Sequence, residues 1–409
     1  MKYLIVLGDG MADRKIPELN DKTPLMYAKK PQMDFLASKS LIGKVQTIPD
    51  GMEPGSGPAN MAVMGYAPEK YYTGRSPLEA VSLGIDMLPT DTAYRTNLVT
   101  LEIPEGGKYE DAIIKDYSSG EISTKESSVL IKDIEKALGD DLKHFYPGRS
   151  YRHCLIWDKG PLDISFTPPH DITGKPIKEF LPKGDRADVI LDMMKKSYEI
   201  LNHHPINEAR RKEGKNVANS IWLWGQGTKP ATPDFTEEYG LKGTMISAVD
   251  LLFGLGRCSG LEAIEVEGAT GTKDTNFIGK ANAAVNAFKN GSDYVYVHLE
   301  APDECGHQGD IEGKVFSIEQ IDSVVLKTIY EYLENNRRTT GEEYHIMVLP
   351  DHPTPIEIRT HAPEAVPFML YKSENEQTSV YGYDEAEAEQ SGIFFENAPK
   401  LFKEFMRAD

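Results

Sequence analysis

Aspartate and histidine side chains recur at three places in the sequence, each time close after a short apolar run. The runs are YLIVLG, DYVYVHL and YHIMVL, and a further histidine follows the third one in RTHAPEAV. Carboxylates combined with imidazoles suit Mn, Zn, Fe or Co better than Ca or Mg. The pattern therefore predicts a site for divalent metals, with six candidate ligands: Asp9, Asp303, His307, Asp351, His352 and His361.

Each of these places also has an ordinary structural interpretation. An aspartate after a strand is often a turn former or a helix cap, and Asp351-His352-Pro353 could form a simple turn. The chain has only 10 histidines, however, and three of them lie beside aspartates in two such segments. Taken together, the three places favour metal chemistry.

A serine supplies a group on which a metal could act. Ser56 lies in the Gly-Ser-Gly turn of PGSGPANMAVMGY, and Pro58 is expected to open a helix there. The positive end of a helix favours anions, and a hydroxyl beside a divalent metal can be deprotonated and attack phosphorus. The alternative is a serine that only caps the helix.

Four apolar stretches are expected to be buried strands: 3–10, 220–227, 293–303 and 344–352. Apolar runs without alternation are typical of a mostly parallel sheet that is covered on both faces. Helical patterns at 24–40, 279–291 and 314–336 lie between them, which indicates an α/β fold. Ligands bind beyond the carboxyl ends of the strands in such sheets, where the candidate metal ligands are placed.

The middle of the chain has a different pattern. Strand-like segments such as YRTNLVTLE and SYRHCLIW alternate with a charged helix near 126–138 and a long helical stretch from Asp185. We expect a smaller α+β domain at 93–217, inserted into a metal-binding core that comprises 1–92 and 218–409.

Composition excludes several classes of protein. The net charge of -19 repels phosphate backbones and argues against nucleic-acid binding. No apolar run approaches the ~20 residues that span a membrane, and the N-terminal apolar run is too short for a signal peptide. Three widely spaced cysteines do not form a disulfide framework, so we expect a cytoplasmic protein.

Eight motifs are spread along the chain: GDGMAD, PGSGPANMAVMGY, YYTGRSPLEA, SYRHCLIW, PHDITGKP, EGATGTKDTN, EAPDECGHQGD and LPDHPTP. Together they resemble the motifs of the archaeal-type cofactor-independent phosphoglycerate mutases, members of the alkaline phosphatase superfamily. The resemblance implies an alkaline-phosphatase-like α/β core, with a mostly parallel sheet flanked by helices and a smaller inserted domain.

The resemblance also implies roles for individual residues. Ser56 is similar to the family's nucleophile, and two divalent ions are implied, manganese first with zinc, cobalt or magnesium as alternatives. One ion would be held by Asp9, Ser56, Asp351 and His352, and the other by Asp303, His307 and His361. In the insert, the implied substrate-binding and acid/base positions are Arg149, Arg152, His153, His170 and Asp171.

The implied reaction interconverts 3-phosphoglycerate and 2-phosphoglycerate without bisphosphoglycerate. Ser56 would take the phosphoryl group, the bound glycerate would reorient, and phosphoserine would return the group to the other hydroxyl. Closure of the insert would exclude water, and its arginines would hold the glycerate carboxylate. The expected partner is therefore a small phosphorylated acid.

One position departs from the family pattern. These mutases usually carry a histidine a few residues after the nucleophile, where this chain has Asn60, which we expect to contact substrate. Similar bacterial proteins have been proposed to be homoserine kinases of threonine biosynthesis, so an ATP-dependent kinase is the main alternative. A plain phosphatase, a phosphopentomutase and a silent scaffold with a structural metal site are further alternatives. His298, inside the third apolar run, is expected to be a core residue.

Overall fold

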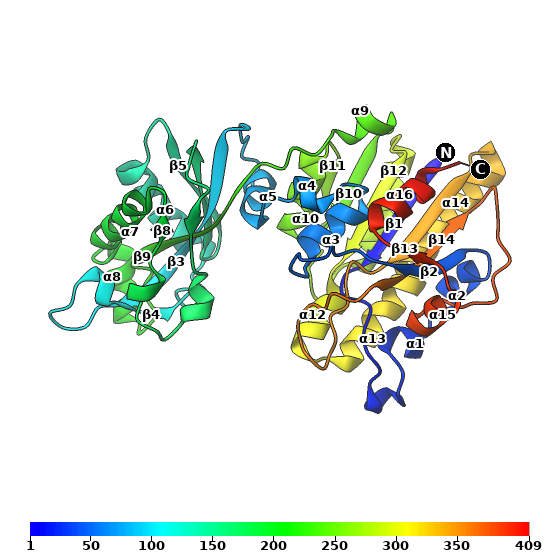
Figure 1. Ribbon diagram of the computed structural model, residues 1–409, viewed down its shortest axis with the longest axis horizontal. Coiled ribbons are helices and arrows are strands. Elements are labelled where there is room, and N and C mark those ends of the chain that lie inside the picture. Colours follow the sequence, from blue (N-terminus) through cyan, green and yellow to red (C-terminus); the bar gives the residue numbers. More distant parts are fainter. Residues whose placement is uncertain (409) are drawn as a thin grey trace. The chain divides into compact units, whose positions relative to one another are not determined.

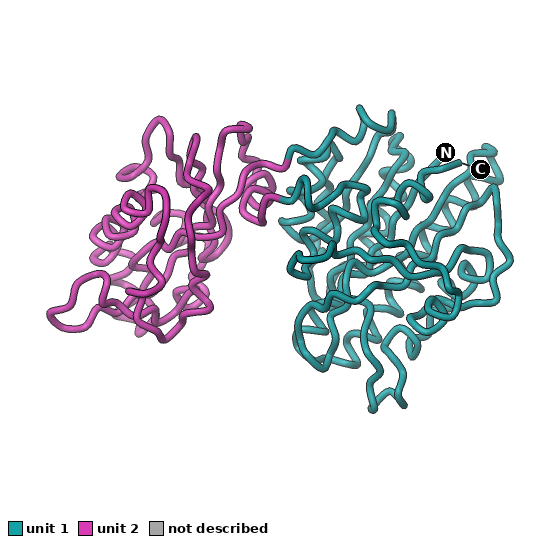
Figure 2. Tube along the Cα trace, viewed as in Figure 1, with its two compact units in different colours: residues 1–72, 231–409 teal, residues 73–230 magenta. Residues whose placement is uncertain are grey.

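The computed structural model describes residues 1–408, and the chain divides into two compact units (Figure 2). The first unit comprises residues 1–72 together with the chain from 231 onward, and the second comprises residues 73–230. The expected boundaries at 92/93 and 217/218 fall inside the second unit, because α5 (Arg75–Ser82) packs on that unit's sheet and β9 (Ser220–Thr228) is one of its strands. Glu79 of α5 accepts two hydrogen bonds from the Arg95 guanidinium, each 2.9 Å long.

An eight-stranded sheet forms the centre of the first unit (Figure 1). The first five strands in the order below are mutually parallel, and β14 is antiparallel to both of its neighbours. The predicted α/β class with a mostly parallel sheet is confirmed. The order is β11 (Glu262–Glu265), β10 (Gly243–Ser247), β12 (Tyr294–Leu299), β1 (Lys2–Gly8), β13 (Tyr344–Leu349), β14 (Val366–Lys372), β2 (Leu41–Val45) and β15 (Phe394–Phe395).

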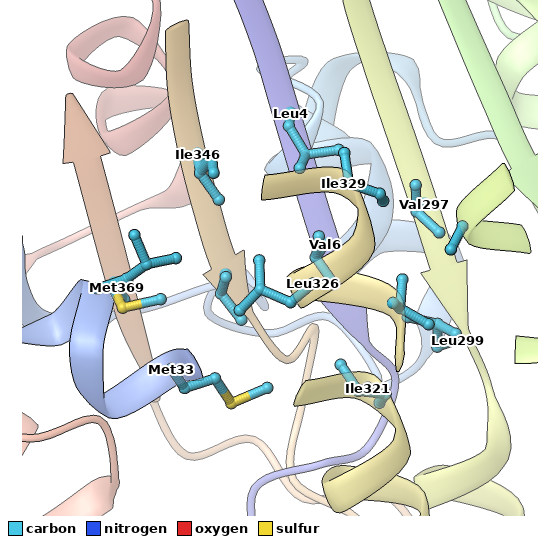
Figure 3. Close-up of a cluster of buried hydrophobic side chains, with 14 of the residues drawn as sticks. Leu4, Val6, Met33, Val297, Leu299, Ile321, Leu326, Ile329, Ile346 and Met369 are labelled. Carbon is cyan, nitrogen blue, oxygen red and sulfur yellow. The ribbon is translucent and has the colours of Figure 1, made fainter. Parts of the chain in front are cut away.

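Helices cover both faces of this sheet, which explains why its central strands are apolar without alternation. On one face, Leu4, Val6 and Val297 pack against Met33 and Ile329 from helices (Figure 3). On the other face, α16 packs against β13 and α3. The helices of this unit are α1 (Pro24–Tyr27), α2 (Pro31–Ala37), α3 (Ser56–Val63), α4 (Pro68–Tyr71), α9 (Phe235–Tyr239), α10 (Asp250–Cys258), α11 (Phe277–Lys289), α12 (Ala301–Gln308), α13 (Ile311–Gln320), α14 (Lys327–Thr340), α15 (Glu385–Gln390) and α16 (Ala398–Met406).

Two predicted helices are interrupted. The expected helix at 24–40 divides into α1 and α2 at Pro31, whose missing N–H suits the first turn of a new helix. The expected helix at 314–336 contains a π-helical turn, η5 (Ile321–Leu326), between α13 and α14. A short 3-10 turn, η1 (Pro17–Leu19), follows β1 in the chain.

The second unit has an antiparallel sheet against which helices pack. Its strands are β3 (Asp91–Glu102), β4 (Ile113–Asp116), β5 (Lys143–Arg149), β6 (Arg152–Asp158) and β9 (Ser220–Thr228), beside a small pair formed by β7 (Ile164–Ser165) and β8 (Lys183–Gly184). Its further helices are α6 (Thr124–Leu138), α7 (Ala187–Leu201) and α8 (Pro205–Lys212), with 3-10 turns at η2 (Tyr109–Asp111), η3 (Pro169–Ile172) and η4 (Lys178–Phe180).

The expectation that 220–227 is a strand of the core sheet was wrong. These residues form β9, which pairs with β3 in antiparallel fashion inside the second unit. An apolar run predicts a buried strand, but it does not specify which of two sheets the strand joins. The core sheet instead contains five strands that were not predicted from the sequence, namely β2, β10, β11, β14 and β15. Within residues 1–408, no helix combines the length and the apolar character needed to cross a membrane.

Candidate metal centre

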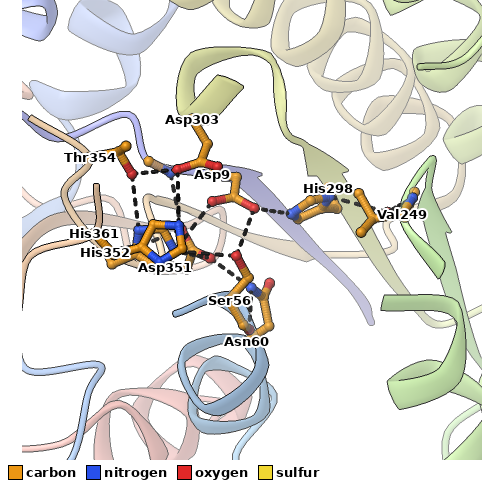
Figure 4. Close-up of polar contacts among 12 residues, drawn as sticks. Asp9, Ser56, Asn60, Val249, His298, Asp303, Asp351, His352, Thr354 and His361 are labelled. Carbon is orange, nitrogen blue, oxygen red and sulfur yellow. Dashed lines mark hydrogen bonds and ion pairs between the residues drawn. The ribbon is translucent and has the colours of Figure 1, made fainter. Parts of the chain in front are cut away.

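Five of the six candidate metal ligands are seen to gather at one edge of the first unit's sheet (Figure 4), namely Asp9, Asp303, Asp351, His352 and His361. Strands β12, β1 and β13 are adjacent and parallel, so their carboxyl ends meet at this edge. Asp9 directly follows β1, Asp351 and His352 follow β13, and α12 begins two residues after β12. Ser56 is the first residue of α3, at the helix end whose free N–H groups favour anions.

Ser56 lies at the centre of the first cluster. Its Oγ is 3.3 Å from Asp9 Oδ2 and 3.2 Å from His352 Nε2. The same imidazole nitrogen is 3.5 Å from Asp9 Oδ1 and 3.4 Å from Asp351 Oδ2. Both aspartates and His352 are buried. Four side chains therefore direct oxygen or nitrogen atoms toward one point.

The second cluster comprises Asp303, His307 and His361. His307 Nε2 is 3.2 Å from Asp303 Oδ2 and 3.1 Å from His361 Nε2, and His361 Nε2 is 3.6 Å from Asp303 Oδ1. The two histidine side chains are 34% and 27% exposed, whereas those of the first cluster's aspartates and His352 are at most 2% exposed. The second cluster is the one that solvent reaches more easily.

The segment that carries Asp303 and His307 is a helix, not the loop that its turn-forming residues suggested. Residues Ala301–Gln308 form α12, in which Pro302 occupies the first turn and Gly309 ends the helix in the left-handed region at φ 72°. Proline at a helix start and glycine just past its end are normal signals. The four-residue spacing therefore places both side chains on one helical face.

The buried charges of the first cluster fit a bound cation. Burial, followed by repulsion from Asp351 and Asp303, raises the pKa of Asp9 well above its usual range. Within residues 1–408, Asp9 Oδ1 is a buried oxygen that no hydrogen-bond donor satisfies. Coordinating atoms of Asp9, Asp351 and His352 lie within 4.8 Å of one another, and the same holds for Asp303, His352 and His361. This mixed carboxylate and imidazole set suits a divalent transition metal.

His298, which we expected to be a core histidine, is buried and also contacts the metal cluster. Its Nε2 is 2.8 Å from Asp9 Oδ2 and its Nδ1 is 3.1 Å from Ser247 Oγ. Burial lowers the pKa of His298 to about 3, so the ring is neutral at pH 7. The residue thus orients a ligand from behind, as hydrogen-bonded partners of metal ligands commonly do. This contact depends on the pairing of β12 with β1, where His298 lies opposite Leu7, and no local sequence signal indicates that pairing.

Asn60 is not placed to contact substrate. The side chain is fully buried, and its amide group donates to Asp351 Oδ2 at 2.8 Å and to the Ser56 carbonyl at 2.9 Å. Its own oxygen accepts from the Tyr296 hydroxyl at 2.6 Å. All of its polar atoms therefore have protein partners, and its contact with Asp351 indicates a role in orienting that carboxylate.

Four of the insert's candidate residues are accessible in the second unit. Arg149 and Arg152 are exposed cross-strand neighbours, and neither forms an ion pair with an acidic group within residues 1–408. His170 and Asp171 lie in η3 with side chains 48% and 59% exposed. The His170 ring packs edge-on against Trp224, with ring centroids 5.4 Å apart. These groups are available for a ligand.

His153 differs from the other insert candidates because it is buried. It shares a face of β6 with Leu155 and Trp157, which belong to the apolar core under the helices. Its Nδ1 accepts a hydrogen bond from the Gly148 N–H at 3.0 Å. Burial lowers its pKa to about 3. A neutral side chain in the core is poorly placed to exchange protons with a substrate.

His153 predicts a pH dependence of stability. The pKa of His153 is about 3 in the folded chain, whereas the ordinary value of 6.5 applies to the unfolded chain. Between pH 3 and pH 6.5, the imidazole is therefore protonated in the unfolded chain and neutral in the folded chain. Stability is therefore lost as pH falls from 6.5 toward 3, by about 1.4 kcal/mol per pH unit for one proton. His153→Asn keeps an acceptor for the Gly148 N–H and cannot titrate. In this variant, the slope of the unfolding free energy against pH is therefore expected to be smaller by the contribution of one proton.

Tryptophan fluorescence during urea unfolding measures this effect, since all 3 tryptophans (Trp157, Trp222 and Trp224) lie in the second unit. His144→Asn, at an exposed histidine of the same unit, is the matched control. Equal slopes for wild type and His153→Asn would contradict the assignment.

Comparisons with known proteins extend over both units. A family model described as 2,3-bisphosphoglycerate-independent phosphoglycerate mutase matches residues 37–207. A probable 2,3-bisphosphoglycerate-independent phosphoglycerate mutase from Geobacter sulfurreducens is 46% identical over 404 residues, which cover 98% of this chain and 99% of that protein. The 2,3-bisphosphoglycerate-independent phosphoglycerate mutase of Methanosarcina barkeri is 46% identical and covers 100% of both chains.

Two solved structures share the fold over nearly the whole length. One is a protein from Pyrococcus horikoshii, with a TM-score of 0.81 and 31% identity over 99% of this chain and 97% of that one. The other is a cofactor-independent phosphoglycerate mutase from Thermoplasma acidophilum, with a TM-score of 0.68 and 25% identity over 100% of both chains.

Proposed function

The chain belongs to the 2,3-bisphosphoglycerate-independent phosphoglycerate mutase family, and on this premise we propose that it interconverts 3-phosphoglycerate and 2-phosphoglycerate through phosphoserine at Ser56. The observation that carries the proposal is the position of Ser56 at the start of α3, with its Oγ between Asp9 and His352. A nucleophile at this place meets a phosphoryl group at the positive end of a helix.

Two divalent ions would complete the site, manganese first with zinc, cobalt or magnesium as alternatives. When bound, they would lower the pKa of the serine hydroxyl and neutralise the oxygens of the phosphoryl group. The unsatisfied Asp9 Oδ1 supports this assignment. The residues that would hold the ions are Asp9, Ser56, Asp351 and His352 for one, and Asp303, His307 and His361 for the other.

In the proposed reaction, Ser56 Oγ forms a bond to phosphorus while the bond between phosphorus and O3 of 3-phosphoglycerate breaks. Asp9 Oδ2 is the atom that can accept the serine proton, since it lies 3.3 Å from Oγ, while Asp9 Oδ1 and His352 Nε2 would face the ion. Ser56 takes this proton back when the phosphoryl group leaves it. O3 takes a proton as it leaves. The retained glycerate then gives up the proton of O2, which attacks phosphorus and releases Ser56.

The second unit supplies the remaining groups in this proposal. Arg149 and Arg152 would bind the carboxylate of the substrate, because exposed guanidinium groups without an acidic partner suit an anion. His170 and Asp171 would exchange protons with O2 and O3. His153 is left out of this set because it is buried.

Phosphorus NMR on the metal-reconstituted protein tests the function. With 3-phosphoglycerate, we expect a 2-phosphoglycerate signal without added bisphosphoglycerate. A second sample with homoserine and ATP tests the kinase alternative. O-phosphohomoserine with ADP, and no 2-phosphoglycerate in the first sample, would overturn the mutase proposal. Release of inorganic phosphate alone would indicate a phosphatase instead.

Arg152→Ala is expected to lower kcat/KM for 3-phosphoglycerate by roughly 10- to 100-fold, since a hydrogen bond to a charged group contributes about 1.5–3 kcal/mol. Most of the loss should lie in KM if the arginine binds the carboxylate equally in the ground state and the transition state. Steady-state kinetics and manganese content measure the effect. Arg186→Ala, which removes another exposed arginine, is the control. Unchanged kinetics in Arg152→Ala would remove this residue from the substrate site.

A further inference from the structure

Thr354 lies between the two ligand clusters, although no role is assigned to it above. It is fully buried, and it follows His352 by two positions. Its hydroxyl contacts Asp303 Oδ1 of one cluster, and His352 Nδ1 of the other cluster lies 3.3 Å from the same oxygen (Figure 4). One hydroxyl group thus touches ligands from both clusters.

The chemistry of these partners fixes the direction of both hydrogen bonds. An ionised carboxylate only accepts, so the threonine proton points to Asp303. The hydroxyl oxygen is then free to accept a proton from His352 Nδ1. With its proton on Nδ1, His352 presents the lone pair of Nε2 to the first cluster, where Ser56 Oγ lies 3.2 Å away. Thr354 therefore selects the coordinating nitrogen in one cluster while it orients the carboxylate in the other.

Two neighbouring segments, residues 10–13 and α13, hold Thr354 in place. Its N–H donates to the Ala12 carbonyl at 3.2 Å, and its own carbonyl accepts from Lys314 Nζ at 2.8 Å. Lys314 is fully buried and also donates to Asp13 at 2.6 Å. The hydroxyl is packed against Gly10, where an added Cβ would lie 2.6 Å from Thr354 Oγ1. A side chain held this firmly can transmit a change at one cluster to the other.

We propose that Thr354 is a positioning residue that links the two metal sites. Each site reaches its full affinity for a divalent ion only when the Thr354 hydroxyl is present. The inference rests on the proposed metal ligands, but it does not depend on which phosphate ester the enzyme uses. Hydrogen-bonded partners of metal ligands typically contribute 10- to 100-fold to metal affinity. Because Thr354 contacts a ligand of each site, its loss should weaken both.

Calorimetric titration of the metal-free protein with Mn²⁺ tests the proposal in the absence of substrate. We expect Thr354→Val, which keeps the shape but removes the hydroxyl, to weaken both binding events by roughly 10- to 100-fold. Thr354→Ser keeps the hydroxyl and should remain within about threefold of wild type. Thr100→Val is the matched control, since it removes a buried threonine hydroxyl that donates to the Val217 carbonyl in the second unit.

Three results would overturn the proposal: wild-type affinity in Thr354→Val, weakening of one event only, or equal weakening in Thr354→Ser. If the valine variant does not fold, as judged by circular dichroism, the comparison of Thr354→Ser with Thr354→Ala isolates the same hydroxyl. The mutase assay is separate. A wild-type protein without mutase activity would refute the proposed function, while weakened Mn²⁺ binding in Thr354→Val would still support the link.

Discussion

Ser56→Ala is expected to abolish the exchange of phosphoryl groups between the two phosphoglycerates. The variant lacks the oxygen that would carry the group, and loss of a nucleophile lowers kcat by roughly 10⁵-fold or more in enzymes with covalent intermediates. Binding of the metal should persist more weakly at one site, because Asp9, Asp351 and His352 remain. The fold should also persist, since Ser56 makes no side-chain cap to α3.

The Ser56→Ala experiment needs three readouts on one preparation. Phosphorus NMR measures the exchange, metal analysis measures the ions retained after dialysis, and mass spectrometry of the wild type after acid quench detects a phosphoryl group on the peptide that contains Ser56. Ser323→Ala is the control, because Ser323 is an exposed serine whose hydroxyl bonds only a helix carbonyl. Full exchange by Ser56→Ala would end the nucleophile assignment.

Asp303→Asn is expected to have the second largest effect. Asp303 supplies the only carboxylate of the second cluster, where it contacts His307 at 3.2 Å and His361 at 3.6 Å. The isosteric amide removes that negative charge and leaves two imidazoles with a neutral neighbour. On the proposed ligand set, we expect the manganese-reconstituted chain to lose the ion of the second site and to lose roughly 10³-fold or more in kcat, as when a preorganised charge-stabilising group is removed.

Metal analysis after dialysis, paired with the mutase assay, measures both effects of Asp303→Asn. Asp310→Asn is the matched control, since Asp310 lies on the same segment, contacts Lys273 and caps α13 without touching either cluster. Excess Mn²⁺ should partly restore activity if the defect is one of affinity. If Asp303→Asn retains two ions and the wild-type kcat, the ligands proposed for the second site are wrong.

The sequence was sufficient to locate the candidate metal edge of the sheet. Asp9 and Asp351 follow apolar runs that were expected to be parallel strands, and parallel strands end at one edge. The nature of α12 was harder to predict, because Pro302 and Gly309 signal a turn as well as a helix start and end. Local signals of this kind are ambiguous until tertiary packing selects one outcome.

Residues that act through another side chain were beyond the reach of sequence patterns. Asn60 and His298 touch Asp351 and Asp9, but these contacts span 291 and 289 positions of the chain. Nothing local distinguishes a buried asparagine that orients a carboxylate from one that binds substrate. The same limit applied to residues 220–227. Their apolar character predicted a buried strand, but it did not predict that this strand pairs with β3. Pairing between distant segments is decided by the whole core.

The order of strands in the first unit has a consequence for synthesis on the ribosome. β1 is made first, yet its two neighbours are β12 and β13, which follow only after the whole second unit. At ~5–20 residues per second, β1 waits on the order of tens of seconds for a partner. The second unit is a continuous segment with its own core, and so it can fold during this delay. An apolar strand that stays unpaired for that time is a target for chaperones. We therefore expect the yield of folded chain in cells to depend on the supply of chaperones, even if the finished protein is stable.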